Sequence, residues 1–270
     1  MRHVVGAALT SLLVVLVGGS SFSVARLLAP VPRPVVATSV ASTWTPLGGA
    51  PAAVAPPVEG SLAVAVTDAE GTHPLAGTAA TTVRPIASVT KTMTALVVLE
   101  GHPLSGGDGP VLTMTATDEA DFRSIAASGG STAPVHTGEQ LTERQLLLGL
   151  MLPSANNLAL TLARWVDGSV DAFVQRLNQR AAALGMTDTH FADPDGLSAA
   201  TTSTAADLVI LGERALADAS LLDIVSTQSA TLPDGTVVHN LDVLLSTQPD
   251  WIGIKTGWTP QAGGCLLFAA

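Results

Sequence analysis

Residues 85–100 read PIASVTKTMTALVVLE, and this stretch carries both a predicted helix and a predicted reactive pair. The part from Thr92 to Glu100 is strongly apolar at helical spacing. Because side chains three residues apart share one face of a helix, Lys91 can reach the hydroxyl of Ser88. A serine becomes a nucleophile when a base takes its proton, and a lysine with a lowered pKa can be that base. The alternative is a capped helix with a surface lysine.

A second polar triplet, Ser154-Ala155-Asn156, lies at the junction of two predicted helices. The first helix is expected to end before Pro153, and the second to begin at Asn156. A hydroxyl and an amide that project from a rigid turn can relay a proton and hold a substrate amide. The alternative is that Ser154 only caps the second helix.

A third triplet, Lys255-Thr256-Gly257, is expected at the end of a strand over residues 251–256. Lys255 and Thr256 offer a cation and a hydroxyl to a carboxylate. Gly257 lets the backbone of a ligand come close, because it has no side chain. The alternative is an ordinary strand that ends in a turn.

The use of lysine sets two of these triplets apart. The chain has ten arginines and only two lysines, and the lysines are Lys91 and Lys255. Arginine keeps its proton at all relevant pH values, so it cannot replace a lysine that acts as a base. This distribution favours a chemical role for both lysines over surface positions.

Together the three triplets form the set found in penicillin-binding proteins and β-lactamases. From about Gly60 onward the chain resembles the low-molecular-mass penicillin-binding proteins of D-alanyl-D-alanine carboxypeptidase type. The resemblance extends to the residues around the triplets, which read PIASVTK (85–91), LPSANN (152–157), STA (203–205) and GIKTG (253–257).

This resemblance implies a serine D-alanyl-D-alanine carboxypeptidase that acts on peptidoglycan stem peptides through an acyl-enzyme. Ser88 would attack the carbonyl of the penultimate D-alanine, and Lys91 would take its proton. Ser154 and Asn156 would relay the proton and orient the substrate. The resemblance further implies covalent inhibition by β-lactams and a reaction without metal or cofactor.

The third triplet supplies the substrate-binding residues that the resemblance implies. Lys255 and Thr256 would face the terminal carboxylate of the substrate, and Gly257 would leave room for it. The backbone amides of Ser88 and Trp258 would form the oxyanion hole.

The order of predicted elements favours an α+β fold, in which helices and a helical lobe flank an antiparallel sheet. The resemblance implies the same fold, that of penicillin-binding proteins and serine β-lactamases, over residues 60–270. Only 13 residues follow Gly257, so the last strand and C-terminal helix of that fold are expected to be missing. The expected strands include 61–67, 251–256 and 263–270, and the expected helices are 92–100, 142–152, 156–165, 169–184 and 203–217.

The N-terminal sequence predicts export. An apolar run from Val4 to Val17 follows Arg2, and Ser23-Val24-Ala25 offers small residues for cleavage. Residues 1–25 are expected to be a signal peptide or an uncleaved signal anchor, and either places the domain outside the cytoplasm, in the cell envelope. The alternative is a buried core helix. Residues 26–59 are rich in proline and alanine and are expected to form an extended linker.

Composition and single residues exclude several other classes of function. The net charge of −10 offers no basic surface for nucleic acid. One cysteine, Cys265, cannot form an internal disulfide and is expected to be a small buried residue. His136 and Glu139 lack further metal ligands in the sequence and are expected to form a polar loop.

Two rival functions remain open. A class A β-lactamase needs an extra glutamate to drive water onto the acyl-enzyme, and the sequence has none between Glu143 and Glu213. Slow release of penicilloyl groups is therefore expected. The second rival is a truncated or non-catalytic envelope protein that keeps the motifs without turnover, which the short stretch after Gly257 suggests.

Overall fold

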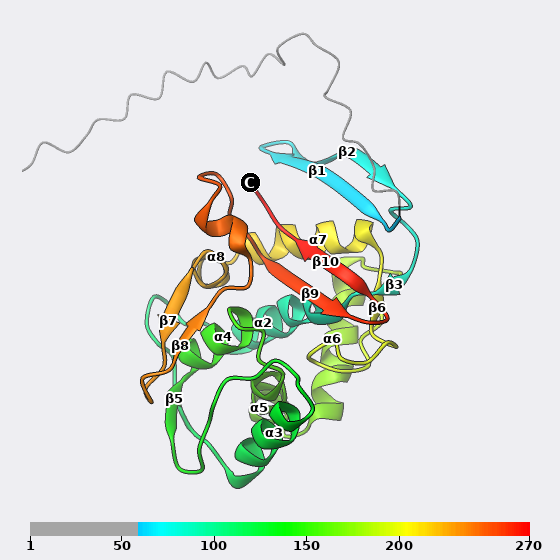
Figure 1. Cartoon of the computed structure of the whole chain (residues 1–270). Coiled ribbons are helices and arrows are strands. Elements are labelled where there is room, and N and C mark those ends of the chain that lie inside the picture. Colours follow the sequence, from blue (N-terminus) through cyan, green and yellow to red (C-terminus); the bar gives the residue numbers. More distant parts are fainter. Residues whose placement is uncertain (1–58) are drawn as a thin grey trace, which may run out of the picture. The chain divides into compact units, whose positions relative to one another are not determined.

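The computed structural model describes residues 59–270, which contain helices and antiparallel strand pairs (Figure 1). The helices are α2 (Thr90–Gly101), α3 (Ala116–Ala127), α4 (Glu143–Met151), α5 (Asn156–Asp167), α6 (Val170–Leu184), α7 (Ala205–Leu216) and α8 (Ala219–Val225), with the 3-10 turns η1 (Ala87–Val89) and η2 (Val243–Ser246). The strands are β1 (Leu62–Asp68), β2 (Gly71–Thr78), β3 (Arg84–Pro85), β4 (Val111–Thr113), β5 (Gln140–Thr142), β6 (Thr202–Ser203), β7 (Ser229–Thr231), β8 (Val237–His239), β9 (Lys255–Thr259) and β10 (Gly263–Leu267).

The centre of the core is α2. Every side chain from Thr90 to Leu99 is buried, so this helix has no solvent-facing side along that length. A helix that is apolar on most of its circumference is stable only inside a protein. Accordingly α2 contacts α4, α5, α6, α7 and α8, which surround it in Figure 1.

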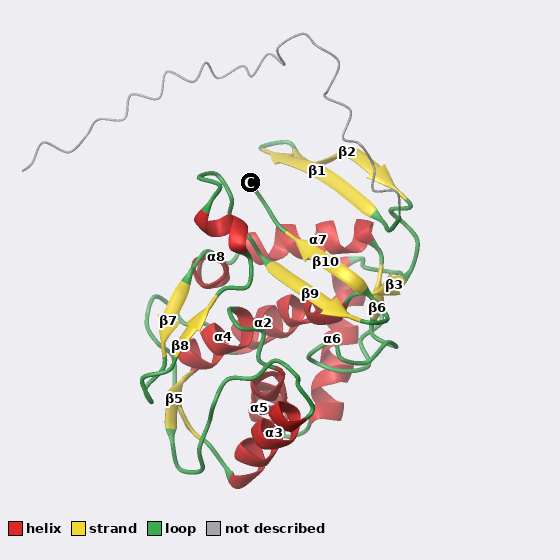
Figure 2. Ribbon diagram, in the orientation of Figure 1, coloured by secondary structure: helices red, strands yellow, loops and turns green. Residues whose placement is uncertain are grey.

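The strands pair antiparallel, as expected for the α+β class, but hydrogen bonds join them two by two (Figure 2). Within residues 59–270 the pairs are β1–β2, β3–β6, β4–β5, β7–β8 and β9–β10. The β9–β10 hairpin positions the site, because β9 contacts η1 at the start of the central helix. Helix α7 packs against both β1 and β10.

The predicted ends of two helices are confirmed. Thr142 and Gln145 form a reciprocal capping box at the start of α4. At α6, the Ser169 hydroxyl accepts a hydrogen bond from the amide of Ala172, and Gly185 ends the helix at φ +81°.

Several predicted boundaries are wrong. The strand expected over residues 263–270 ends at Leu267, and the helix expected from Thr92 begins at Thr90. The helix expected from Ser203 begins at Ala205, because Ser203 belongs to β6 and Thr204 is the N-cap residue. The strand expected over residues 251–256 begins only at Lys255. Gly253 has φ +64°, which interrupts an extended backbone, so the Lys-Thr-Gly triplet opens β9 instead of ending a strand.

No helix within residues 59–270 has the length and apolar character needed to cross a membrane. The expected export segment, residues 1–25, and nearly all of the expected linker, residues 26–59, lie outside the described residues.

Candidate active site

The amine of Lys91 is the centre of the site. Its Nζ lies 2.9 Å from Oγ of Ser88, 2.7 Å from Oδ1 of Asn156 and 2.7 Å from the carbonyl oxygen of Asp195. The amide and carbonyl oxygens can only accept hydrogen bonds, whereas a hydroxyl can also donate one. Once Lys91 is neutral, its two protons satisfy those oxygens, and its lone pair is left for the hydroxyl of Ser88.

Local structure explains how Ser88 and Lys91 meet. Ser88 lies in η1, and Lys91 lies in the first turn of α2, so the two side chains are three residues apart on one face. Lys91 has no exposed surface. Burial lowers its pKa to about 8, although the charges of Asp195 and Asp193 oppose that change.

A second part of the site is the turn between α4 and α5. Asn156 is the first residue of α5, and its backbone amide donates to the carbonyl of Ser131. The neighbouring Asn157 exchanges two hydrogen bonds with the backbone of Ala133. These bonds hold the Asn156 side chain against Lys91 because they fix the start of the helix to residues 131–133.

Ser154 is not the cap of α5, which excludes that alternative. The N-cap residue is Ala155, which has no hydroxyl. Ser154 has φ +64°, and its Oγ is buried without a hydrogen-bond partner among the described residues. A strained backbone and an unsatisfied buried hydroxyl both cost stability, and such features concentrate at functional sites.

A third part of the site is the start of β9. Lys255 is buried. Burial and, to a smaller extent, the charge of Lys91 lower its pKa to about 7, while Asp242 opposes the change. A Cβ placed on Gly257 would lie 2.9 Å from the backbone nitrogen of Ser88. Only glycine therefore allows β9 to approach Ser88 this closely.

The structure thus brings most of the predicted site residues together. Ser88, Lys91 and Asn156 share hydrogen bonds, and Gly257 lies against Ser88. Thr256 is half-buried beside Gly257. Trp258 is 69% exposed, so its side chain is not part of the buried site. Only its backbone amide could act there.

Sequence reasoning missed Asp195 and the strain at Ala87. The carbonyl of Asp195 binds Lys91 from 104 residues away, and its only local sequence signal is the turn-like Asp193-Pro194-Asp195-Gly196. Ala87, directly before Ser88, has φ +47°, a conformation that costs energy in any residue with a side chain.

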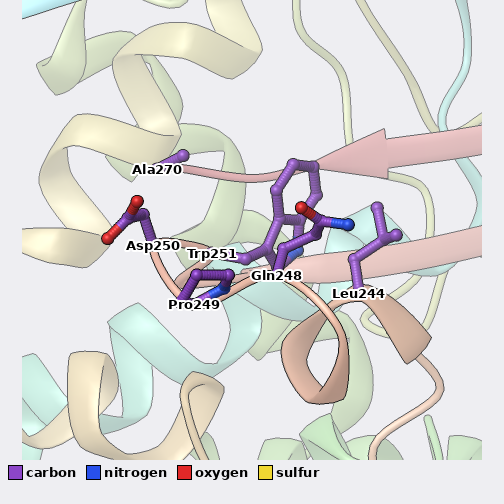
Figure 3. A pocket seen from close by; sticks show the side chains of 6 residues that line it. All are labelled: Leu244, Gln248, Pro249, Asp250, Trp251 and Ala270. Atoms are coloured by element: carbon purple, nitrogen blue, oxygen red, sulfur yellow. The ribbon is translucent and has the colours of Figure 1, made fainter.

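Two hollows in the described part of the chain border η2, and Ser88 lines neither of them. The larger, about 310 Å³, is lined by six residues including Leu244, Pro249 and Trp251, which Figure 3 shows. The smaller, about 210 Å³, borders His239 and Asp242. No predicted site residue lines either hollow.

The remaining single residues occupy ordinary positions. The backbone amide of His136 donates to the carboxylate of Glu139 in an exposed polar loop. Within residues 59–270 no three or more His, Cys, Asp or Glu side chains gather as metal ligands. Cys265 is only half-buried, against the expectation of a fully buried residue, because it lies on β10 at the edge of the core.

Comparison with known proteins agrees with this geometry. A family model described as D-alanyl-D-alanine carboxypeptidase matches residues 51–270. The D-alanyl-D-alanine carboxypeptidase DacB2 of Mycobacterium tuberculosis is 36% identical over 182 residues, which cover 63% of this chain and 62% of that protein. DacF of Bacillus subtilis, also named a D-alanyl-D-alanine carboxypeptidase, is 31% identical over 188 residues, covering 68% of this chain and 47% of that protein.

Among solved structures, the Streptomyces K15 DD-transpeptidase matches with a TM-score of 0.68 at 32% identity, over 77% of this chain and 84% of that one. The chain spans about half to two thirds of the length of the two curated relatives. The extent of the family match and these identities show that the chain belongs to the D-alanyl-D-alanine carboxypeptidase family.

Proposed function

We propose that this protein is a serine-type carboxypeptidase that removes the terminal D-alanine from peptidoglycan stem peptides. The observation that carries the proposal is the position of the buried Lys91 amine, 2.9 Å from Oγ of Ser88. Its other two contacts are acceptor oxygens, so the neutral amine is directed at the hydroxyl.

In the proposed reaction, Lys91 takes the proton of Ser88 while Oγ attacks the carbonyl carbon of the penultimate D-alanine. The backbone amides of Ser88 and Trp258 stabilise the oxyanion that forms. The carbon–nitrogen bond then breaks, and the proton held by Lys91 passes through Ser154 to the leaving amine, which returns Lys91 to its neutral form. Water, deprotonated by the same base, attacks the acyl-enzyme and releases the shortened peptide.

The substrate's own charge assists the base in this scheme. A terminal carboxylate beside Lys255 and Thr256 favours the protonated form of Lys255. The charge of Lys91 lowers the pKa of Lys255. Because two buried positive charges repel each other, a charged Lys255 would in turn disfavour the proton on Lys91. Binding of the carboxylate therefore promotes the neutral form of Lys91.

The acyl acceptor and the cellular location are parts of the same proposal. The relatives are named as carboxypeptidases and as a transpeptidase, and these activities differ in passing the acyl group to water or to an amine. We propose water as the acceptor. Residues 1–25 would export the domain to the cell envelope. Residues 26–59 would either link it to an uncleaved membrane anchor or form the free N-terminal segment after cleavage.

Labelling with a fluorescent penicillin tests the proposal. The wild-type protein should give a covalent band that is absent in Ser88→Ala, and it should release D-alanine from a pentapeptide ending in D-alanyl-D-alanine. A folded protein without a band would favour the non-catalytic envelope protein. Rapid turnover of a chromogenic cephalosporin would instead favour a β-lactamase.

A further inference from the structure

The loop from Asp193 to Ser198 is held in one conformation by its own first residue. The Asp193 carboxylate accepts hydrogen bonds from the backbone amides of Gly196 and Ser198, and from the hydroxyl of Thr201. All of these donors lie within eight residues of Asp193. The loop is therefore rigid by its own bonding before any contact with the rest of the site.

The same loop is fastened to the helix that carries the predicted base. The Thr94 hydroxyl donates to the carbonyl of Pro194 at 2.6 Å, and the Lys91 amine donates to the carbonyl of Asp195 at 2.7 Å. Two successive backbone carbonyls thus accept hydrogen bonds from side chains of α2. Because this loop fixes Nζ on one side, the amine has little freedom to leave Ser88.

The side chain of Asp195 is buried, like the Lys91 amine that its carbonyl binds. Asp195 is 4% exposed, and one oxygen of its carboxyl accepts from the backbone amide of Leu197. Burial raises its pKa to about 6, with a further increase from Asp193, while Lys91 opposes the change. The carboxylate charge in turn favours the protonated amine of Lys91.

Other charges act on Lys91 from two directions. Asp193, on the same loop, also favours its protonated form. From β9, the charge of Lys91 lowers the pKa of Lys255 while Asp242 opposes that change, so a charged Lys255 would repel the protonated amine of Lys91. Among these, Asp195 is the only residue that both bonds to Nζ through its carbonyl and acts on it through a buried carboxyl.

We propose that Asp195 is a positioning residue whose carbonyl aims the Lys91 amine at Ser88 and whose carboxylate decides how readily that amine gives up its proton. The inference rests on the proposed function in taking Lys91 as the base. It assigns Asp195 no contact with the substrate.

Carbon-13 NMR of the full chain labelled at lysine Cε tests the electrostatic part directly. Only two lysine signals are expected, and Lys255→Arg assigns them. In Asp195→Asn, the titration midpoint of Lys91 should fall by about 1 pH unit, since a nearby opposite charge is removed. Asp195→Glu keeps the negative charge, so the titration midpoint of Lys91 should stay close to the wild-type value. Asp188→Asn, which removes the same charge from an exposed position, should leave it unchanged.

Kinetics give the second readout. The acidic limb of the pH profile of penicillin acylation should move to lower pH in Asp195→Asn by the same amount as the Lys91 midpoint. A folded Asp195→Asn with an unshifted midpoint would overturn the inference, even where acylation is normal. If that variant does not fold, the wild-type Lys91 signal must show a second inflection near pH 6, where Asp195 ionises, and its absence would overturn the inference equally.

The two proposals fail separately. A wild-type protein that shows the coupled titration but is not labelled by penicillin would remove the proposed function alone. Normal labelling without the coupling would remove only the role of Asp195.

Discussion

A Cβ built on Gly196 would lie 1.9 Å from the carbonyl oxygen of Ala87, the residue before Ser88. Gly196 follows Asp195, so the loop that binds Lys91 also packs directly on the backbone just before Ser88. Gly196 has φ +80°, which other residues adopt only with strain. This one position therefore combines a conformational requirement with a steric one.

Gly196→Ala and Gly185→Ala separate these two requirements. Gly185 has φ +81° but no heavy atom within 4 Å of its Cβ position. We expect Gly185→Ala to lower the free energy of unfolding by about 1–2 kcal/mol through backbone strain alone. Gly196→Ala should lose about 1–3 kcal/mol more, because the methyl group forces the loop and the Ala87 backbone apart. Denaturant unfolding measures both, and equal losses would show that the close approach is unimportant.

The Ser154 side chain is expected to lower the stability of the fold and to speed acylation. Ser154→Gly removes both the strain at φ +64° and the buried unpaired hydroxyl, so the free energy of unfolding should rise by about 1 kcal/mol. Ser154→Ala removes only the hydroxyl and should be less stable than Ser154→Gly. Both should acylate with penicillin about 100-fold more slowly, the usual cost of losing a proton-transfer group. Wild-type acylation in both variants would exclude Ser154 from the proton relay.

Lys91→Arg tests whether the base must be able to lose its proton. Arginine keeps the positive charge, so we expect acylation by fluorescent penicillin to fall at least about 100-fold. Lys91→Met has a similar length without an amine and serves as the second variant, in case the larger guanidinium disturbs the buried site. Circular dichroism establishes folding in each. Acylation at the wild-type rate in either folded variant would mean that another group is the base.

Glu143, which lies outside the candidate site, should make the free energy of unfolding depend on pH. It is the first residue of α4, and both oxygens of its carboxyl are buried without a partner among the described residues. Burial raises its pKa from 4.5 to about 7. Between these two values the folded protein retains a proton that the unfolded chain has released, so the free energy of unfolding falls as the pH rises from 4.5 through 7.

Glu143→Gln should remove this dependence, because the amide stays neutral. At pH 8 the variant should be more stable than the wild type by roughly 1–3 kcal/mol, and at pH 4 the two should be similar. Glu213→Gln, on an exposed position of α7, is the matched control and should follow the wild type at both pH values. A difference that does not change with pH would show that Glu143 is ionised in the folded protein.

Features encoded by neighbouring residues could be predicted from the sequence. The pair of Ser88 and Lys91 meets because three residues of helix bring them together, and the caps at Thr142 and Ser169 depend only on the next turn. The three triplets were expected to converge because their types and order match one kind of chemistry. The α+β class followed from the order of the elements.

Features that depend on distant packing could not be predicted. The loop at Asp195 reaches Lys91 only in the folded chain, and its local bonding gives no sign of that destination. The strand that carries Lys255 was placed too early because its apolar residues continue back to Trp251, while the left-handed backbone at Gly253 interrupts it. The positive φ angles at Ala87 and Ser154 likewise arise from tertiary contacts that override local preference.

The burial of α2 on every side has a consequence for how the protein can adapt to a ligand. An amide of this helix reaches solvent only when the helices around it separate, so its hydrogen exchange should be among the slowest in the molecule. Lys91 therefore lies on a helix that can move only when the helices packed around it move. Any change of shape around a ligand is therefore expected in the elements around α2 and not in α2 itself.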